Sequence, residues 1–403
     1  MKITISHRAW TIICCFSLIG LLMAGCGREL SDEEAAASTT TTTTTTVTST
    51  STSSTTSTTV DSTPVIVPIA GGGSFSYQNI ASTGTNGNIY SSIAVDKNNA
   101  NRVHISYYQK DTEDLKYASG TISSWAFETV DSAGDRGLYS SIGIDSNQKI
   151  QISYYATSAG LAFAYGSGGS WTTATVDNPT GIDVGYYTSL GIDSGNKAHI
   201  SYYDWDNQAL KYATNKSGAW VVTTLDGSGN TGLYSSLAID SGNNIHISYY
   251  DAGNKDLKYA NYSAGAWHFQ TIDSADDVGM FSSIAVDASG NPHIAYYNAT
   301  AQTLKYAGRN GSWSTATVDP TTDRGKFSSI AVDSSGRAHV SYYDSTNSAL
   351  IYATNKSGSW LYSTIDITGS VGQDTDIAMG SDDKAHISYW DATNNTVKYA
   401  VEN

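Results

Sequence analysis

The chain has 403 residues, of which 15% are charged, and its formal net charge is −15 at pH 7. An acidic chain of this kind lacks the basic face that nucleic acids require, so we expect no nucleic-acid partner. The 28 tyrosines and 37 glycines, set against five prolines, favour strands and turns over helices.

Residues 1–25 have the pattern of a secretory signal peptide. Lys2 and Arg8 precede an apolar stretch over residues 10–23, which is too short for a comfortable membrane span. Residues 22–26, Leu-Met-Ala-Gly-Cys, resemble the bacterial lipoprotein box. The resemblance implies a lipid on Cys26 and attachment of the mature protein to a membrane of the bacterial cell envelope. The alternative is an ordinary cleaved signal with an incidental cysteine.

A glycine rather than an aspartate follows the cysteine, and this favours the outer membrane or the cell surface. Residues 38–59 are all Ser or Thr except Val47, and three glycines follow at 71–73. Such a segment has too little to bury to offset the entropy of ordering. We therefore expect residues 26–72 to be the lipidated N-terminus followed by a disordered stalk.

Four sequence blocks recur from residue 73 to residue 403. The first block, Ser-Ser-Ile-Ala-Val-Asp at 91–96, returns six times at steps of 46 to 49 residues. Each block is short, alternating or β-branched, and bounded by turn residues, which indicates antiparallel strands joined by hairpins. Seven repeats of four strands predict an all-β fold, a seven-bladed β-propeller over residues 73–403. An open solenoid is the alternative.

The order of the blocks indicates how the ring closes. Residues 75–81 align with the fourth, Trp-containing block but precede the first repeat, and the last repeat stops after its third block. An N-terminal strand is therefore expected to complete the last blade, so that no strand edge is left open. The fourth residue of the first block is always Ala or Gly, as expected for an innermost strand crowded against the axis. The Trp block is expected to be outermost.

The segment Ile284–Asn291, Ile-Ala-Val-Asp-x-x-Gly-Asn, resembles the strand and turn of NHL-type propeller repeats. The repeated region as a whole is similar in plan to propeller lectins. This resemblance implies a fold, whereas propellers host lectins, hydrolases, lyases and scaffolds alike.

Histidine begins six of the seven second blocks, and Gln151 is the exception. A metal site needs ligands that converge, yet equivalent positions in neighbouring blades are expected to lie roughly 10 Å apart. We therefore expect no metal site and no cofactor, and we expect each histidine to bond within its own blade, to a recurrent Ser or Asp. The Tyr-Tyr pairs of the same block are also expected to be structural.

The connections between the fourth block and the next first block read Asp-x-x-x-Asp-x-Gly-x-aromatic and must emerge on one face. Their carboxylates and rings either cap turns before a glycine or form a ligand-binding face. A single Trp205, between two aspartates in a hairpin, is a further candidate stacking platform. The candidate ligand-binding residues are Trp205, Asp135, Asp183, Asp277, Asp323, Tyr139, Tyr187 and Tyr234.

Catalytic motifs are missing from the sequence. There is no Gly-x-Ser-x-Gly, no His-Glu-x-x-His and no phosphate-binding loop, and we assign no catalytic residue. We expect a monomeric, non-catalytic binding or adhesion module on a lipid anchor, with a glycan or an envelope or extracellular protein as its ligand. The alternatives are an extracellular polysaccharide hydrolase or lyase and a structural scaffold.

Overall fold

The structure is a computed structural model that describes residues 64–84, 87 and 89–403. The predicted signal peptide, Cys26 and the stalk up to residue 63 lie outside the described residues. Among the residues that are described, no helix has the length and apolar character needed to span a bilayer.

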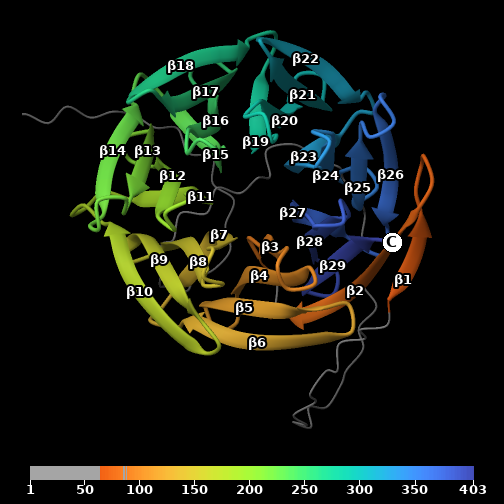
Figure 1. Cartoon of the computed structure of the whole chain (residues 1–403), viewed down its shortest axis with the longest axis horizontal. Coiled ribbons are helices and arrows are strands. Elements are labelled where there is room, and N and C mark those ends of the chain that lie inside the picture. Colours follow the sequence, from red (N-terminus) through yellow and green to blue (C-terminus); the bar gives the residue numbers. More distant parts are fainter. Residues whose placement is uncertain (1–63, 85–86, 88) are drawn as a thin grey trace, which may run out of the picture. The chain divides into compact units, whose positions relative to one another are not determined.

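The described residues form seven antiparallel blades arranged in a ring, as predicted; six of the sheets have four strands and the seventh has a fifth strand added at its outer edge (Figure 1). In blades one to six the four strands of a blade follow one another in the sequence, from the axis outwards. The first three blades are β3 (Ser92–Asp96), β4 (Arg102–Gln109), β5 (Asp114–Thr121) and β6 (Ser124–Asp131); β7 (Arg136–Ile144), β8 (Ile150–Ala156), β9 (Gly160–Ser167) and β10 (Ser170–Asp177); and β11 (Val184–Ile192), β12 (Ala198–Asp204), β13 (Ala209–Thr214) and β14 (Val221–Asp226).

The remaining blades continue the pattern, and the seventh takes strands from both ends of the described region. They are β15 (Thr231–Ile239), β16 (Ile245–Asp251), β17 (Asp256–Ser263) and β18 (Ala266–Asp273); β19 (Val278–Val286), β20 (Pro292–Asn298), β21 (Thr303–Asn310) and β22 (Ser312–Asp319); β23 (Arg324–Val332), β24 (Ala338–Asp344), β25 (Ala349–Thr354) and β26 (Leu361–Asp366); and β27 (Val371–Met379), β28 (Ala385–Asp391), β29 (Thr396–Glu402), β2 (Ser74–Ser82) and β1 (Val65–Pro68).

The innermost strands need small side chains because neighbouring blades approach closely there. A Cβ atom on Gly191 of β11 would lie 2.5 Å from Leu237 Cδ2 of the next blade. Such a contact would force the blades apart, since protein interiors are packed without spare volume. This accounts for glycine at the fourth position of the first block in blades two and three, and the other five blades carry alanine, the smallest side chain with a Cβ, at that position.

Strand β2 closes the ring by pairing with β29, as predicted. Phe75 takes the place of the tryptophan of the other outer strands, and its ring lies 4.9 Å from that of Tyr352 in blade six. Beyond β2, β1 (Val65–Pro68) adds a fifth strand, although the sequence analysis had assigned residues up to 72 to the stalk. Three β-branched residues followed by a proline suit an edge strand. Proline has no backbone N–H, and the open side of an edge strand has no neighbouring strand that would need one.

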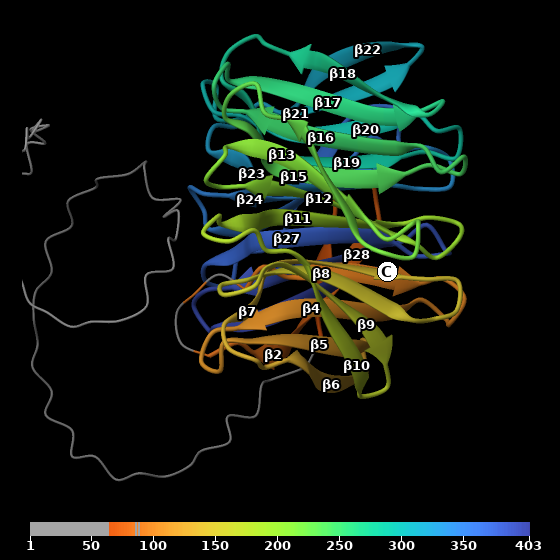
Figure 2. The ribbon, with the colours of Figure 1, turned by 90° about the vertical axis from the view of Figure 1, so that its left-hand side faces the viewer.

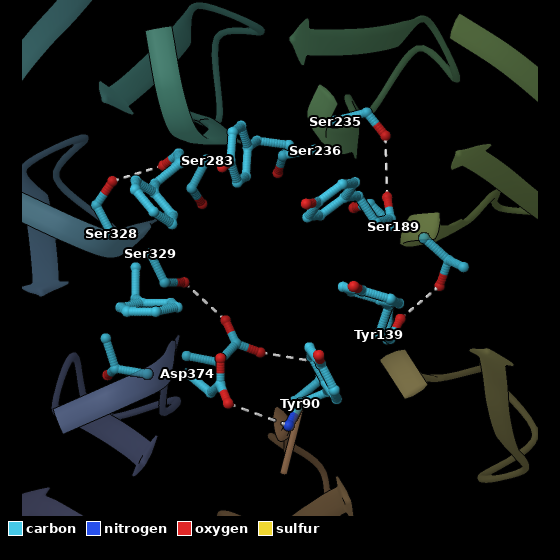
Figure 3. A pocket seen from close by; sticks show the side chains of 18 of the residues that line it. Tyr90, Tyr139, Ser189, Ser235, Ser236, Ser283, Ser328, Ser329 and Asp374 are labelled. Atoms are coloured by element: carbon cyan, nitrogen blue, oxygen red, sulfur yellow. Dashed lines mark hydrogen bonds between the residues drawn. The ribbon is translucent and has the colours of Figure 1, made fainter. Parts of the chain in front are cut away.

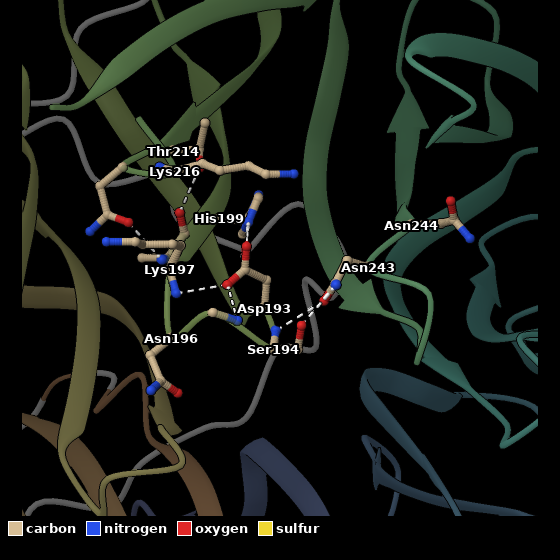
Figure 4. Close-up of polar contacts among 12 residues, drawn as sticks. Asp193, Ser194, Asn196, Lys197, His199, Thr214, Lys216, Asn243 and Asn244 are labelled. Carbon is tan, nitrogen blue, oxygen red and sulfur yellow. Dashed lines mark hydrogen bonds and ion pairs between the residues drawn. The ribbon is translucent and has the colours of Figure 1, made fainter. Parts of the chain in front are cut away.

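In six of the seven blades a histidine–tyrosine hydrogen bond lies at the face that carries the turns between first and second strands, which we call the turn face. Figure 4 shows the surroundings of the histidine in blade three. In blade three, His199 Nδ1 lies 2.5 Å from Tyr212 OH and Nε2 lies 3.2 Å from Asp193 Oδ2. The imidazole Nε2–H therefore donates to the carboxylate while Nδ1 accepts from the phenol. Burial lowers the pKa of His199, which keeps the ring neutral. Each of the six histidines therefore bonds within its own blade, as predicted, but the partner common to all six is a tyrosine, and a hydrogen bond to an aspartate is present in blades three, four and six.

The tyrosine of this hydrogen bond also contacts the next blade. The ring of Tyr212 packs edge-on against that of Trp267 at a centroid distance of 5.2 Å. Equivalent pairs join neighbouring blades around the ring, and such aromatic contacts add to the burial of their apolar surface. The other pairs are Tyr117–Trp171, Phe163–Trp220, Tyr259–Trp313, Tyr306–Trp360 and Tyr399–Trp125.

A second link between blades joins a carboxylate to a tyrosine and a lysine, and the sequence analysis missed it. Asp226, at the end of β14, accepts hydrogen bonds from Tyr249 OH at 2.8 Å and Lys258 Nζ at 2.7 Å of the next blade. Burial raises the pKa of Asp226, but the bonds from Lys258, Ser228 and Tyr249 outweigh it and lower this pKa to about 2. The carboxylate is therefore ionised and paired at neutral pH.

Candidate functional site

The face opposite the turn face carries the connections between blades and the hairpins between second and third strands. We call it the loop face; the strands run between the two faces (Figure 2). Hairpin and connection touch on it, as where the backbone N–H of Trp205 donates to the Asp183 carbonyl at 3.0 Å. The sequence prediction that the acidic connections emerge on one face is consistent with this arrangement.

The local sequence explains why each connection turns an aromatic ring towards the axis. Its glycine packs against the previous blade, since a Cβ on Gly185 would lie 2.8 Å from the Leu161 backbone nitrogen. A bulge in the pairing of β11 with β12 follows, between Tyr186 and Ser189, and it holds Tyr187 at a φ of 52°. A bulge re-aims the side chain that it carries, and a bulky residue at positive φ is uncommon.

The seven connections together surround a cavity of about 230 Å³ on the axis, which we call the axial cup (Figure 3). Each blade contributes three consecutive residues to its lining. In six blades the first of the three is aromatic, and neighbouring rings lie 4.3 to 4.9 Å apart in an unbroken series. The series is Tyr90, Tyr139, Tyr187, Tyr234, Phe281 and Phe327.

Hydroxyl groups below the rings join each blade to its neighbour. Ser235 Oγ donates to the Tyr187 carbonyl at 3.1 Å, and Ser189 Oγ accepts from the Leu237 backbone N–H at 2.9 Å. The same two bonds recur at most of the other blade junctions. The wall of the cup is thus polar and held in place by bonds that need no ligand.

The seventh blade breaks this series with two carboxylates. Asp374 stands where the other blades have an aromatic ring, and its Oδ2 accepts from the backbone N–H groups of Ile89 at 3.2 Å and Tyr90 at 3.4 Å. Asp376 replaces the second serine and accepts from Ser92 Oγ at 2.9 Å and Ser329 Oγ at 2.7 Å. The axial cup therefore has six aromatic sides and one acidic side.

The two carboxylates differ in setting. Burial raises the pKa of Asp376, against the opposing effect of the hydrogen bonds that it accepts. It bonds to both neighbouring blades, at Ile93 N–H (2.9 Å) and, through Ser329, to blade six. The sequence analysis did not single out Asp376, although the change from Ser to Asp in the last repeat is visible in the sequence.

The predicted ligand-binding residues divide into two groups. Tyr139, Tyr187 and Tyr234 line the axial cup. The four predicted carboxylates are not among its described lining residues, and they lie further out, bonded to the tyrosines and threonines of the loop face. Asp135 accepts from Tyr108 OH and Thr157 Oγ1, Asp183 from Tyr155 OH and Tyr186 OH, Asp277 from Tyr250 OH with Lys255 Nζ at 3.1 Å, and Asp323 from Thr346 Oγ1 at 3.4 Å.

These bonds show what the second tyrosine of each Tyr-Tyr pair does. Its hydroxyl reaches over the loop face and fixes the connection that leads to the next blade, as Tyr108 fixes Asp135 at 2.9 Å. The four carboxylates therefore bond to side chains of the loop face, whereas the backbone bonds of turn capping are made by the first aspartate of a connection, as where Ala133 N–H donates to Asp131 Oδ1 at 3.0 Å. No group of three or more His, Cys, Asp or Glu side chains able to hold a metal occurs in the described part of the chain.

Comparisons with known proteins identify the fold. No family model matches the chain, and no curated protein matches it. Solved structures do resemble it: a lectin of Burkholderia pseudomallei has 14% identity and a TM-score of 0.57, with 75% of this chain and 95% of that chain covered. A mutant of AofleA from Arthrobotrys oligospora has 13% identity and a TM-score of 0.52, covering 73% and 91%. A polysaccharide lyase, an ulvan lyase, has 13% identity and a TM-score of 0.55, covering 80% and 95%.

Proposed function

We propose that this protein is a non-catalytic glycan-binding module whose ligand enters the axial cup. The unbroken series of six aromatic rings around that cup carries the proposal. Ring faces stack on the apolar faces of sugars, while hydroxyls and carboxylates close by bond the sugar hydroxyls. The fold of a propeller lectin agrees with this function without establishing it, because one fold serves many functions.

The charge of the cup narrows the class of glycan. Its described lining includes Asp374 and Asp376 but no lysine, arginine or histidine, and the whole chain has a net charge of −15. Like charges repel most strongly in a partly desolvated site. We therefore infer that neutral glycans bind and that sulfated or uronic-acid polymers are rejected.

The proposal is tested by removing the last two rings of the aromatic series, which lie nearest to Asp374 in chain order. Full-length protein carrying Phe281→Ala and Phe327→Ala is expected to bind neutral oligosaccharides at least tenfold more weakly than the parent, since each stacking ring contributes about 1 kcal/mol. Isothermal titration calorimetry after a glycan-array screen measures this loss.

Phe127→Ala serves as the matched control, because Phe127 is an exposed ring on the outer strand β6. Its affinity is expected to equal that of the parent. Equal affinities of the parent and the cup variant, or no binding of any glycan by the parent, would contradict the proposal.

A polysaccharide hydrolase or lyase is the second candidate, and one observation favours it. Only blade seven places two carboxylates in the cup, and acid–base cleavage uses two carboxyl groups whose pKa values differ. Burial raises the pKa of Asp376. Cleavage of a polysaccharide by the parent protein that is lost in Asp376→Asn would replace the binding function with this one.

Display on the cell envelope is part of the same proposal. We infer that Cys26 carries a lipid, that the Ser/Thr-rich segment before the propeller spaces the cup from the membrane, and that the protein acts as a monomer at the outer membrane or the cell surface. Incorporation of a labelled fatty acid into the parent but not into Cys26→Ser is expected. Labelling of both proteins, or of neither, would refute the lipid anchor.

A further inference from the structure

Blade three differs from the other six at two positions of the loop face. The residue before the cup aromatic is Tyr186 there, and the hairpin between its second and third strands carries Trp205. The counterparts of Tyr186 are Ile89, Leu138, Leu233, Met280, Lys326 and Gln373. The counterparts of Trp205 are Lys110, Thr157, Ala252, Ala299, Ser345 and Ala392. Both changes add an aromatic ring, and both occur in the same blade.

The two added rings contact each other and the cup. Tyr186 lies 5.2 Å from Trp205 and 5.4 Å from Tyr139, between ring centroids. Tyr139 in turn belongs to the series around the axial cup, where it adjoins Tyr187 at 4.9 Å. The aromatic surface of the cup therefore continues outwards along blade three and ends at Trp205.

The rings of blade three differ in how far they are exposed to solvent. Tyr186 and Tyr203 are almost completely buried, at 3% and 2% exposure, and Trp205 covers them while remaining half-buried itself. The indole packs at 37° to the plane of Tyr186 and edge-on to Tyr203. One side of Trp205 is thus held by the protein, which leaves the other for a ligand.

Hydrogen bonds hold this arrangement rigid. Asp183 accepts from Tyr186 OH and Tyr155 OH, each at 2.9 Å. The backbone N–H of Asp183 donates to Asp206 Oδ2 at 2.8 Å, which ties the connection to the hairpin of Trp205. Asp206 is exposed, so it presents acceptor capacity beside the indole. A fixed ring with neighbouring polar acceptors loses little entropy when a sugar stacks on it.

We propose that Trp205 forms a second sugar subsite and that the ligand is an oligosaccharide lying from the axial cup along blade three. This inference rests on the proposed function, because it takes the cup as the first subsite. The chain offers its own replacement residues for a test. Blade four carries Leu233 and Ala252 at the two positions, and its loop face forms the same connections, with Ala252 N–H bonded to the Asn230 carbonyl at 2.8 Å.

The experiment compares full-length parent with Tyr186→Leu/Trp205→Ala, using gluco-, manno- and galacto-configured oligosaccharides of one to six sugars. In the parent, affinity is expected to rise with chain length. In the double variant, affinity for the hexasaccharide is expected to fall about tenfold, as loss of one stacking platform implies, while monosaccharide affinity changes less than twofold. Phe269→Ala, which removes an exposed ring from the outer strand β18, is the matched control and is expected to behave as the parent.

The outcomes separate the two proposals. Parent and double variant with the same dependence on length would overturn the second subsite and leave the cup standing. An equal loss for monosaccharide and hexasaccharide would also overturn it, because Trp205 would then act only by supporting the cup residue Tyr139 through Tyr186. A parent that binds no saccharide of any length would overturn the proposed function, and the second subsite with it.

Discussion

Departures from the sequence repeat differ between two regions of the molecule, the contacts between blades and the surface of the loop face. Between blades, a departure from the repeat comes with a second departure that restores the interaction. Blade two has Ala162 where other blades have the lysine of the Tyr–Asp–Lys link, and Arg136 lies 3.7 Å from the Asp131 carboxylate instead. Blade six has Ile351 there, and Arg324 bonds to Asp319 at 3.2 Å.

The histidine position of blade two shows the same compensation. Gln151 replaces the histidine, and Phe163 replaces the tyrosine whose hydroxyl the histidine would need. Gln151 Nε2 instead donates to Asp145 Oδ2 and to the Asn196 carbonyl of the next blade, each at 3.4 Å. On the loop face, by contrast, Tyr186, Trp205 and the two aspartates of blade seven change the chemistry of the surface. Repetition therefore marks the residues that hold the ring, and under the proposed function we expect these exceptions to select the ligand.

The largest effect is expected from removing a carboxylate between blades. Asp226→Ala leaves Lys258 and Tyr249 without their acceptor in a mostly buried place, and we expect it to lower the free energy of unfolding by about 3 kcal/mol. Asp206→Ala, an exposed carboxylate of the loop face, is expected to cost less than about 1 kcal/mol. Urea unfolding of both variants measures the difference. Equal losses in the free energy of unfolding would show that the contacts between blades and the loop face do not differ in their contribution to stability.

A smaller effect is expected from the histidines and depends on pH. Burial lowers the pKa of His104 and of His386 to about 4. Because the unfolded chain then binds more protons between pH 6.5 and 4, their contribution to stability is present above pH 6.5 and is lost as the pH falls towards 4. Each lowered pKa corresponds to roughly 1.4 kcal/mol of that loss for every pH unit below 6.5, down to about pH 4.

His104→Gln/Tyr117→Phe, which copies the pair found in blade two, is expected to reduce the acid loss by the share of one histidine. Thermal unfolding at pH 7, 5.5 and 4 provides the measurement. A variant whose stability falls with pH as steeply as that of the parent would show that the buried histidines do not control acid unfolding.

The fold could be predicted from the sequence because the same four strand patterns occur in seven repeats. The period, the small residue of the inner strand and the position of Phe75 each predicted a feature that the structure has. The cup tyrosines were also predicted as ligand candidates, since an aromatic that recurs after Asp-x-Gly had to face one side of the ring.

What the sequence left open depends on contacts between repeats. The bond from Tyr108 OH to Asp135 joins residues 27 positions apart, and no local pattern reports it. The Tyr–Asp–Lys link had a signal, the joint appearance of Ala162 with Arg136 and of Ile351 with Arg324, but it is readable only once the neighbours are known. Strand β1 escaped notice because its four residues follow directly on a segment of low complexity.

If the proposed lipid anchor holds the protein by its N-terminal side, the extra strand β1 has a mechanical consequence. Any pull on the chain before Val65 reaches β1 first, and its four pairs with β2 open one at a time from that end. The closing strand β2 is better secured, through its pairing with β29 and the bonds of Ser74 and Ser76 to Asn403. Release of residues 65–73 would lengthen the proposed tether by about 30 Å while the ring stays shut, so a force on the N-terminal segment would extend the chain before it opened the propeller.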